Sequence, residues 1–266
     1  MDTQAAGLGF GSIQEVNALG REAAHAVYAR LVPAELAARL GVGPLGFGSD
    51  GRRLLSITAP ADQPWVRVEV RSRAEDRDPT LLIDVEMWAA AVPELAFVQI
   101  TDPGAPRYGI DRAENGDDTL FGTTARNLEE ERRAMKDGLA PGQVRPGLRL
   151  LSRVVEAMED FCRLIGKDVF LIEPLFYHSA ILYERRGCGY LMGRETMDEI
   201  HAGFGEAGRL RAALDGSSPF RQPGAERTVR GRSWALHDGV ARFGGVKMYK
   251  LVGRAAGVST FPDAVY

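Results

Sequence analysis

The 21 residues from Phe170 to Tyr190, FLIEPLFYHSAILYERRGCGY, concentrate side chains that are able to act in acid–base or nucleophilic chemistry. His178 and Glu173 could form an acid–base pair or half of a metal site. No third metal ligand stands at a readable spacing from them, so we predict no metal site. We interpret His178 first as a residue at the start of a helix, with its ring hydrogen-bonded inside the fold.

Two further carboxylates stand in the segment TLLIDVEMW. Asp84 and Glu86 are two residues apart and therefore share one face of a strand, opposite Val85 and Met87. The structural interpretation makes that face the one in contact with water. The functional interpretation makes Glu86 a general base in a central cleft.

Composition and charge restrict the class of protein. The chain has 266 residues, of which 45% are hydrophobic and 26% charged, and its formal net charge is −3. This charge gives no broad electrostatic reason to bind nucleic acid or an anionic membrane. The apolar runs are short, and the start of the chain, MDTQAAGLGFGSIQE, lacks the basic region and apolar core of a secretory signal. We expect a cytoplasmic protein with no membrane or nucleic-acid partner.

The N-terminal half is expected to contain helices followed by a largely antiparallel sheet. Apolar residues at helical spacing predict a helix over 12–31, with Ser12 as its cap, and a second helix over 33–40. Strand candidates follow in RRLLSITA, WVRVEVRS, TLLIDVEMW and ELAFVQIT. The second of these alternates cleanly, and the last is nearly all apolar, which predicts a central position in the sheet.

The rest of the chain predicts a layered α/β pattern. Residues 102–142 are a polar, turn-rich candidate insertion, which includes a charged and solvated helix in NLEEERRAMKDG with Asn127 as its cap. An apolar stripe that includes Leu151 and Met158 predicts a long helix from Gly147 to Ile165, with both side chains toward the sheet. A strand in DVFLIEPL, a helix in YHSAILYERRG and a strand in CGYLMG come next. The segment RSWALHDGVARFGGVKMYKLVG predicts two strands joined by a turn.

The run ILYERRGCGY resembles the tail signature of the GNAT superfamily of acyl-CoA N-acyltransferases, commonly Leu-Tyr-Glu-x-x-Gly-Phe. Leu182, Tyr183, Glu184 and Gly187 match it, and Cys188 stands at the phenylalanine position. The order of long helix, strand, tyrosine-bearing helix and strand is also similar, and GVKMYKLVG resembles the closing strand. The resemblance implies a single α/β domain over 1–266, a GNAT-like mixed sheet flanked by helices, with N-terminal helices and an insertion.

The resemblance also implies a site for acetyl-CoA or another acyl-CoA. The pyrophosphate of coenzyme A suits a helix N-terminus with free backbone N–H groups and a glycine that lets the chain approach closely. Gly147 and Leu148 are expected to open the long helix here. The residues that the resemblance implies for cofactor binding are Gln143, Val144, Arg145, Gly147, Leu148 and Arg149.

Two functions are compatible with these residues. The first is acyl transfer from the thioester to an amine of a small molecule, with Glu86 or water taking the proton and Tyr183 protonating the thiolate. The second is a GNAT-like protein without catalysis that binds a ligand or a partner. It is favoured by departures from the family pattern, namely a glycine four rather than three residues after Gln143 and Arg149 where a small residue is usual. A homodimer is left open in either case.

Overall fold

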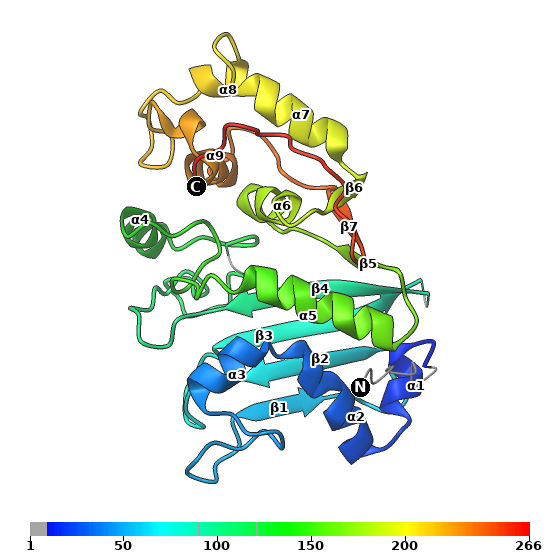
Figure 1. The fold of residues 1–266 in the computed structure, drawn as a ribbon. Coiled ribbons are helices and arrows are strands. Elements are labelled where there is room, and N and C mark those ends of the chain that lie inside the picture. Colours follow the sequence, from blue (N-terminus) through cyan, green and yellow to red (C-terminus); the bar gives the residue numbers. More distant parts are fainter. Residues whose placement is uncertain (1–9, 90, 121) are drawn as a thin grey trace. The chain divides into compact units, whose positions relative to one another are not determined.

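The computed structural model describes residues 10–89, 91–120 and 122–266, so most of the N-terminal segment analysed for a secretory signal lies outside the described residues. Within these residues the chain is a mixed α/β protein with nine α-helices and one seven-stranded mixed sheet (Figure 1). The predicted α/β class is therefore confirmed. The chain separates into two compact units. The segment Gly104–Pro146, which contains most of the expected insertion 102–142, belongs to the second unit.

The first unit comprises the described residues up to Pro103, together with Gly147–Glu173 and Tyr249–Ala255. Its helices are α1 (Ile13–Asn17), α2 (Arg21–Tyr28), the 3₁₀ turn η1 (Ala29–Leu31), α3 (Ala34–Leu40) and α5 (Leu151–Leu164). Its strands are β1 (Leu55–Thr58), β2 (Trp65–Val70), β3 (Leu81–Trp88), β4 (Val92–Ile100), β5 (Val169–Ile172) and the second part of β7 (Lys247–Leu251).

The first four strands form the antiparallel sheet that their alternation predicts. The three valines of β2, Val66, Val68 and Val70, are fully buried, and they pair with β3 in a continuous antiparallel register. Strand β4 is antiparallel to β3 and parallel to β5, which makes it central, as its apolar sequence predicts. The strand order is β1-β2-β3-β4-β5-β7-β6.

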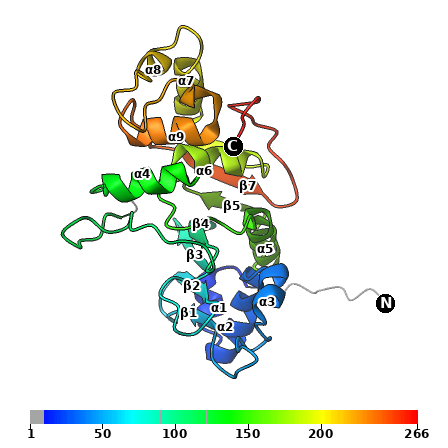
Figure 2. The same cartoon turned by 90° about the vertical axis from the view of Figure 1, so that its left-hand side faces the viewer.

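Helices cover the buried face of these strands. Figure 1 shows α2, α3 and α5 in front of the sheet, and Figure 2 shows the same two layers from the side. Met158, Phe161 and Cys162 of α5 are at most 1% exposed, and the rings of Phe161 and Tyr28 lie 5.8 Å apart. Burial of these large apolar side chains is the main favourable term for this layer.

The predicted helix over 12–31 is interrupted. Ser12 caps α1, with its side chain accepting a hydrogen bond from the Glu15 backbone N–H. Gly20 then has φ = +88°, which a helix cannot include, and α2 begins at the next residue. Glycine adopts such a conformation at no steric cost, so the chain turns there while its apolar positions stay buried.

The second unit comprises Gly104–Pro146, Pro174–Met248 and Ala256–Tyr266. Its elements are α4 (Leu128–Lys136), α6 (Tyr177–Glu184), β6 (Gly189–Met192), α7 (Arg194–Gly203), α8 (Arg209–Ala212), the 3₁₀ turn η2 (Ala225–Arg227), α9 (Val229–His237) and the start of β7. Helix α6 packs on α9. The indole of Trp234, on α9, donates a hydrogen bond of 2.8 Å to the carbonyl of Leu139 and stacks on Phe220.

Helix α9 corrects the prediction of two strands in this region. The Thr228 side chain caps it by accepting a hydrogen bond of 2.9 Å from the Gly231 backbone N–H. Val229, Arg232, Ser233 and Leu236 are buried at the i, i+3, i+4, i+7 spacing of a helix. The strand prediction is wrong here because the buried residues follow a cap at helical spacing, and within RSWALHDGVARFGGVKMYKLVG only β7 is a strand.

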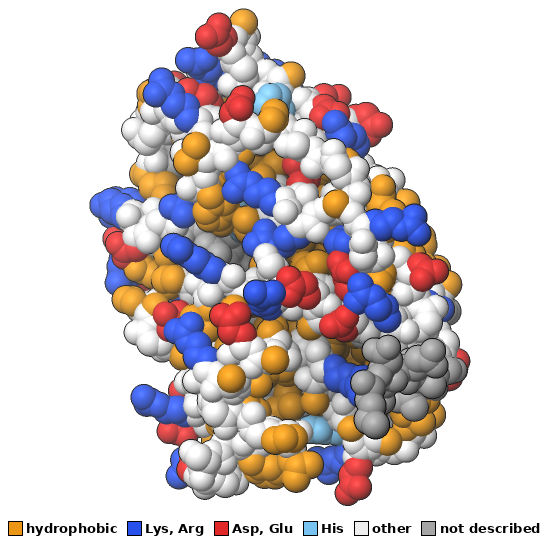
Figure 3. Space-filling model, viewed as in Figure 1, with side chains coloured by type: hydrophobic (Ala, Val, Ile, Leu, Met, Phe, Trp, Pro, Cys, Tyr) orange, Lys and Arg blue, Asp and Glu red, His pale blue; other side chains and the backbone are white. Residues whose placement is uncertain are grey.

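The surface is mixed in charge. On the face shown in Figure 3, basic and acidic side chains are interspersed among hydrophobic ones, as a net charge of −3 leads one to expect. None of the helices that the structure describes is long and apolar enough to cross a bilayer.

Candidate functional site

The N-terminus of α5 is the predicted site for a pyrophosphate. The helix begins at Leu151, whereas Gly147 and Leu148 were expected to open it. Arg149 explains the difference, because its φ of +61° lies in the left-handed region that a right-handed helix cannot include. The N-cap residue, Leu150, provides no side-chain acceptor, so the first backbone N–H groups of α5 have no side-chain cap.

Gly147 brings this helix start to the end of β4. A Cβ atom at Gly147 would lie 3.2 Å from the carbonyl oxygen of Ile100, the last residue of β4. The chain therefore leaves the sheet after Ile100 and returns to the same place before α5. Ligand sites in α/β sheets lie at the carboxyl ends of strands, where crossover helices begin. Gly147 and Arg149 are exposed at this point.

The other half of the predicted loop belongs to the second unit and makes internal contacts there. The Gln143 side chain accepts a hydrogen bond of 2.7 Å from the Ala140 backbone N–H. Val144 is buried in an apolar cluster with Tyr108, Ile110, Ala134 and Leu139. The Arg145 guanidinium donates to the carbonyl of Ala105. These three side chains therefore make contacts that stabilise their own segment of the second unit.

The strand carboxylates differ in their surroundings. Asp84 accepts two hydrogen bonds of 2.7 Å from Arg67 on β2, while Glu86 is exposed. Glu86 pairs with Glu94 of β4, whereas Ile100 pairs with Leu81 at the other end of β3. This register puts Glu86 roughly 17–20 Å along the sheet from the start of α5.

Glu94 is a carboxylate that the sequence interpretation missed. It is 3% exposed and stands on the central strand, opposite Glu86 on one side and Leu171 of β5 on the other. A single acidic residue within the apolar run VPELAFVQI was the available signal. A buried carboxylate on a strand that borders a parallel pair is a candidate general base.

Tyr183 and Glu184, two residues of the signature run, have different environments at the end of α6. Tyr183 is 6% exposed, and burial raises the pKa of its hydroxyl above the ordinary tyrosine value. No hydrogen bond joins that hydroxyl to a residue in the described part of the chain. Glu184 instead accepts hydrogen bonds from the Thr260 hydroxyl at 2.6 Å and the Tyr190 hydroxyl at 2.5 Å. Glu184 therefore links α6 to β6 and to the C-terminal segment through hydrogen bonds.

His178 lies inside the second unit, as its structural interpretation predicted. Its Nδ1 is 3.0 Å from the Ser233 hydroxyl, and its Nε2 is 3.4 Å from the Ser179 hydroxyl. Burial, followed by the charge of Arg230, lowers the pKa of His178 to about 3. The ring is neutral at physiological pH, so Nδ1 can accept the Ser233 proton in a hydrogen bond.

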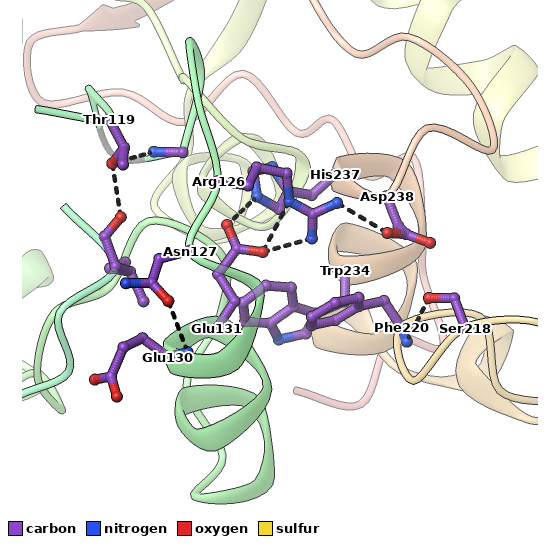
Figure 4. A network of polar contacts seen from close by, with 12 residues as sticks. Thr119, Arg126, Asn127, Glu130, Glu131, Ser218, Phe220, Trp234, His237 and Asp238 are labelled. Atoms are coloured by element: carbon purple, nitrogen blue, oxygen red, sulfur yellow. Dashed lines mark hydrogen bonds and ion pairs between the residues drawn. The ribbon is translucent and has the colours of Figure 1, made fainter. Parts of the chain in front are cut away.

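A partly buried ionic network in the second unit joins α4 to the end of α9 (Figure 4). Glu131 is 1% exposed, and its carboxylate accepts hydrogen bonds from His237 Nε2 at 3.0 Å and from Arg126 at 2.8 Å. Arg126 also pairs with Asp238 at 2.8 Å, and Asp238 pairs with Arg221 at 2.7 Å. The solvated helix predicted over 127–137 therefore carries one buried charge, because distant residues provide its partners.

The network fixes both the charge of Glu131 and the orientation of His237. Burial alone would raise the pKa of Glu131, but the hydrogen bonds from His237 and Arg126 outweigh it and hold the pKa below the ordinary carboxyl range. Gly122, with φ = +83°, packs on this pair: a Cβ atom there would lie 3.0 Å from Glu131 and 3.1 Å from His237. A carboxylate that fixes one ring nitrogen leaves the other available as an acceptor.

The described residues contain no group of three His, Cys, Asp or Glu side chains arranged to hold a metal ion. Comparison with known proteins finds no matching family model, no matching curated protein and no matching solved structure. The assignment of a function therefore rests on the residues and their geometry.

Proposed function

We propose that the protein transfers an acyl group from acetyl-CoA or another acyl-CoA to an amine of a small molecule. The start of α5 carries this proposal. An uncapped helix N-terminus, an exposed arginine at position 149 and a glycine against the end of β4 together make an anion-binding turn of the kind a pyrophosphate needs.

The order of elements gives further support. The GNAT resemblance implies a long helix, a strand, a tyrosine-bearing helix, a strand and a closing strand, and the chain has α5, β5, α6, β6 and β7 in that order. The segment 101–146 interrupts the connection between β4 and α5. Since Gly147 returns to Ile100, this segment can be an insertion into a GNAT-like fold.

In the proposed reaction, the neutral amine attacks the thioester carbonyl and the thiolate of coenzyme A leaves. Tyr183 would protonate the thiolate, because a phenol is protonated at neutral pH and can donate its proton to the leaving sulfur. Glu86 or a water molecule would take the proton from the amine. Glu94, which the register places opposite Glu86, is a second candidate for this base.

One observation favours the alternative function, a GNAT-like protein that binds a ligand without catalysis. Gln143, Val144 and Arg145 are occupied by contacts within the second unit. Cofactor binding would therefore rely on Gly147, Leu148, Arg149 and the first turn of α5 alone.

Thermal unfolding with and without acetyl-CoA tests the proposal. A ligand that binds only the native state at about 100 times its Kd adds about 2.7 kcal/mol, or roughly 5–10 °C in Tm for a chain of this size. Arg149→Glu places a negative charge at the anion site and should abolish the shift. Arg73→Glu, which changes another exposed arginine of the same unit, is the matched control and should keep it.

A wild-type shift that Arg149→Glu removes and Arg73→Glu retains would support the site. If neither acetyl-CoA nor free coenzyme A at millimolar concentration changes the Tm of the wild-type protein, acyl transfer from an acyl-CoA is excluded and the non-catalytic alternative stands. A shift that survives Arg149→Glu would mean that coenzyme A binds somewhere other than the start of α5.

A further inference from the structure

A pocket of about 420 Å³ lies in the second unit beside the ionic network. His237, Ser233 and Thr123 supply polar groups to its wall, and Phe176, Phe243 and Arg242 supply aromatic rings and a charge. All the lining residues belong to the second unit. The volume falls within the range of pockets that bind small organic molecules.

Helix α9 aims two polar side chains at this pocket. Ser233 and His237 are four residues apart and therefore lie one turn apart on the same face of the helix. The Ser233 hydroxyl is held by His178, and His237 is held through Nε2 by the buried Glu131. Their positions are therefore set by partners outside the pocket.

The hydrogen bond to Glu131 determines what His237 offers to a ligand. With the proton on Nε2 donated to the carboxylate, the neutral ring has its lone pair on Nδ1. In the described part of the chain no residue forms a hydrogen bond with Nδ1. The pocket thus presents an oriented acceptor for an O–H or N–H group.

The charged residue in the pocket wall indicates which second group a ligand would carry. The network beside the pocket contains two arginines and two carboxylates, Arg126, Arg221, Glu131 and Asp238, so its formal charges cancel. Arg242 is the one residue with a permanent charge among the described residues that line the pocket, and it is exposed. An exposed guanidinium beside aromatic rings favours a planar carboxylate.

We propose that this pocket binds a small aromatic carboxylate that also carries a hydrogen-bond donor, such as a hydroxyl or an amino group. The carboxylate pairs with Arg242, the ring lies against Phe176 and Phe243, and the donor binds Nδ1 of His237. This inference goes beyond acyl transfer and requires no coenzyme A, so its test is independent of the cofactor experiment.

Isothermal titration calorimetry of the full chain with 4-hydroxybenzoate tests the proposal. Benzoate lacks the donor and phenol lacks the charge, so each should bind about tenfold or more weakly than 4-hydroxybenzoate, the loss expected for about one hydrogen bond or ion pair. Arg242→Gln should weaken 4-hydroxybenzoate to the level of phenol. Arg209→Gln, at an exposed arginine of the same unit outside the pocket, is the matched control and should leave the affinity unchanged.

Gly122→Ala provides a second, independent variant. The added Cβ would press on His237 and Glu131, so it should reduce the preference for 4-hydroxybenzoate over benzoate while the ion pair with Arg242 remains. The proposal is overturned if the wild-type protein gives no binding heat with any of the three probes at millimolar concentration. It is equally overturned if Arg242→Gln binds 4-hydroxybenzoate as tightly as wild type does, or if Arg209→Gln weakens it as much.

Discussion

Tyr183 and Tyr190, in and beside the signature run, differ in what their hydroxyl groups contact. Removing each hydroxyl therefore tests a catalytic role in one case and a stabilising role in the other. Tyr183 has no hydrogen-bond partner among the described residues, whereas the Tyr190 hydroxyl lies 2.5 Å from Glu184. Once an accepted amine is found, Tyr183→Phe should lower turnover by about 10²–10⁴-fold, because the thiolate loses its acid. Its stability should change by less than about 0.5 kcal/mol, since no internal hydrogen bond is lost.

Tyr190→Phe is the control for that experiment. It removes a hydrogen bond to a buried carboxylate and should cost about 1.5 kcal/mol in urea unfolding while turnover stays at the wild-type level. Wild-type turnover in Tyr183→Phe would show that the Leu-Tyr-Glu match marks the fold and has no part in the chemistry.

Helix α5 has one face toward the sheet, and substitutions can test which of its residues lie on that face. Met158 is 1% exposed, so Met158→Asp should bury an unpaired charge and unfold the first unit or cost more than about 3 kcal/mol. Leu151, expected from the apolar stripe to be equally intolerant, is only half-buried and is the first residue of the helix. An aspartate is favourable in the first turn of a helix, so Leu151→Asp should cost less than about 1 kcal/mol.

Urea denaturation monitored by far-UV circular dichroism measures both changes. Equal destabilisation by the two substitutions would contradict the helix start at Leu151 and restore the earlier start predicted at Gly147.

Across the whole molecule, hydrogen-bonded carboxylates in both units make stability depend on pH. Hydrogen bonds outweigh burial at Glu131 and Asp238 in the second unit and at Glu159 in the first, and all three pKa values are lowered on folding. Glu159 is paired with Lys250 at 2.6 Å. A lowered folded-state pKa contributes stability that is present above the unfolded pKa, about 4, and is lost as the pH falls through the folded value.

We therefore expect the free energy of unfolding to begin to fall below about pH 7, where His178 gains a proton only in the unfolded chain, and to fall more steeply between about pH 5 and 3, where the carboxylates also gain protons. Glu131→Gln should lower stability at neutral pH and reduce this slope, whereas Glu199→Gln, at an exposed position on α7, should leave the slope unchanged. Urea unfolding at a series of pH values measures the slope. An identical slope in Glu131→Gln would show that this network does not control the acid response.

Local patterns in the sequence were sufficient for the elements whose signals involve neighbouring residues. The alternation of Val66, Val68 and Val70 predicted β2 and its buried face, and Asn127 was correctly expected to cap α4. Periodicity and capping depend on residues within a few positions of each other, so they can be read without knowing the fold. Even so, α9 was missed, and with it the common face of Ser233 and His237.

Only the tertiary structure decided which charges are buried and which side chains share a site. Glu131 stands in a run of charged residues that predicts a solvated face, and it is buried because His237, 106 positions away, and Arg126 hydrogen-bond its carboxylate. Gly147 meets Ile100 only after an excursion of more than 40 residues. A buried ion pair is stable only when both partners and their hydrogen bonds are in place, and residues this far apart are brought together by the packing of the whole chain.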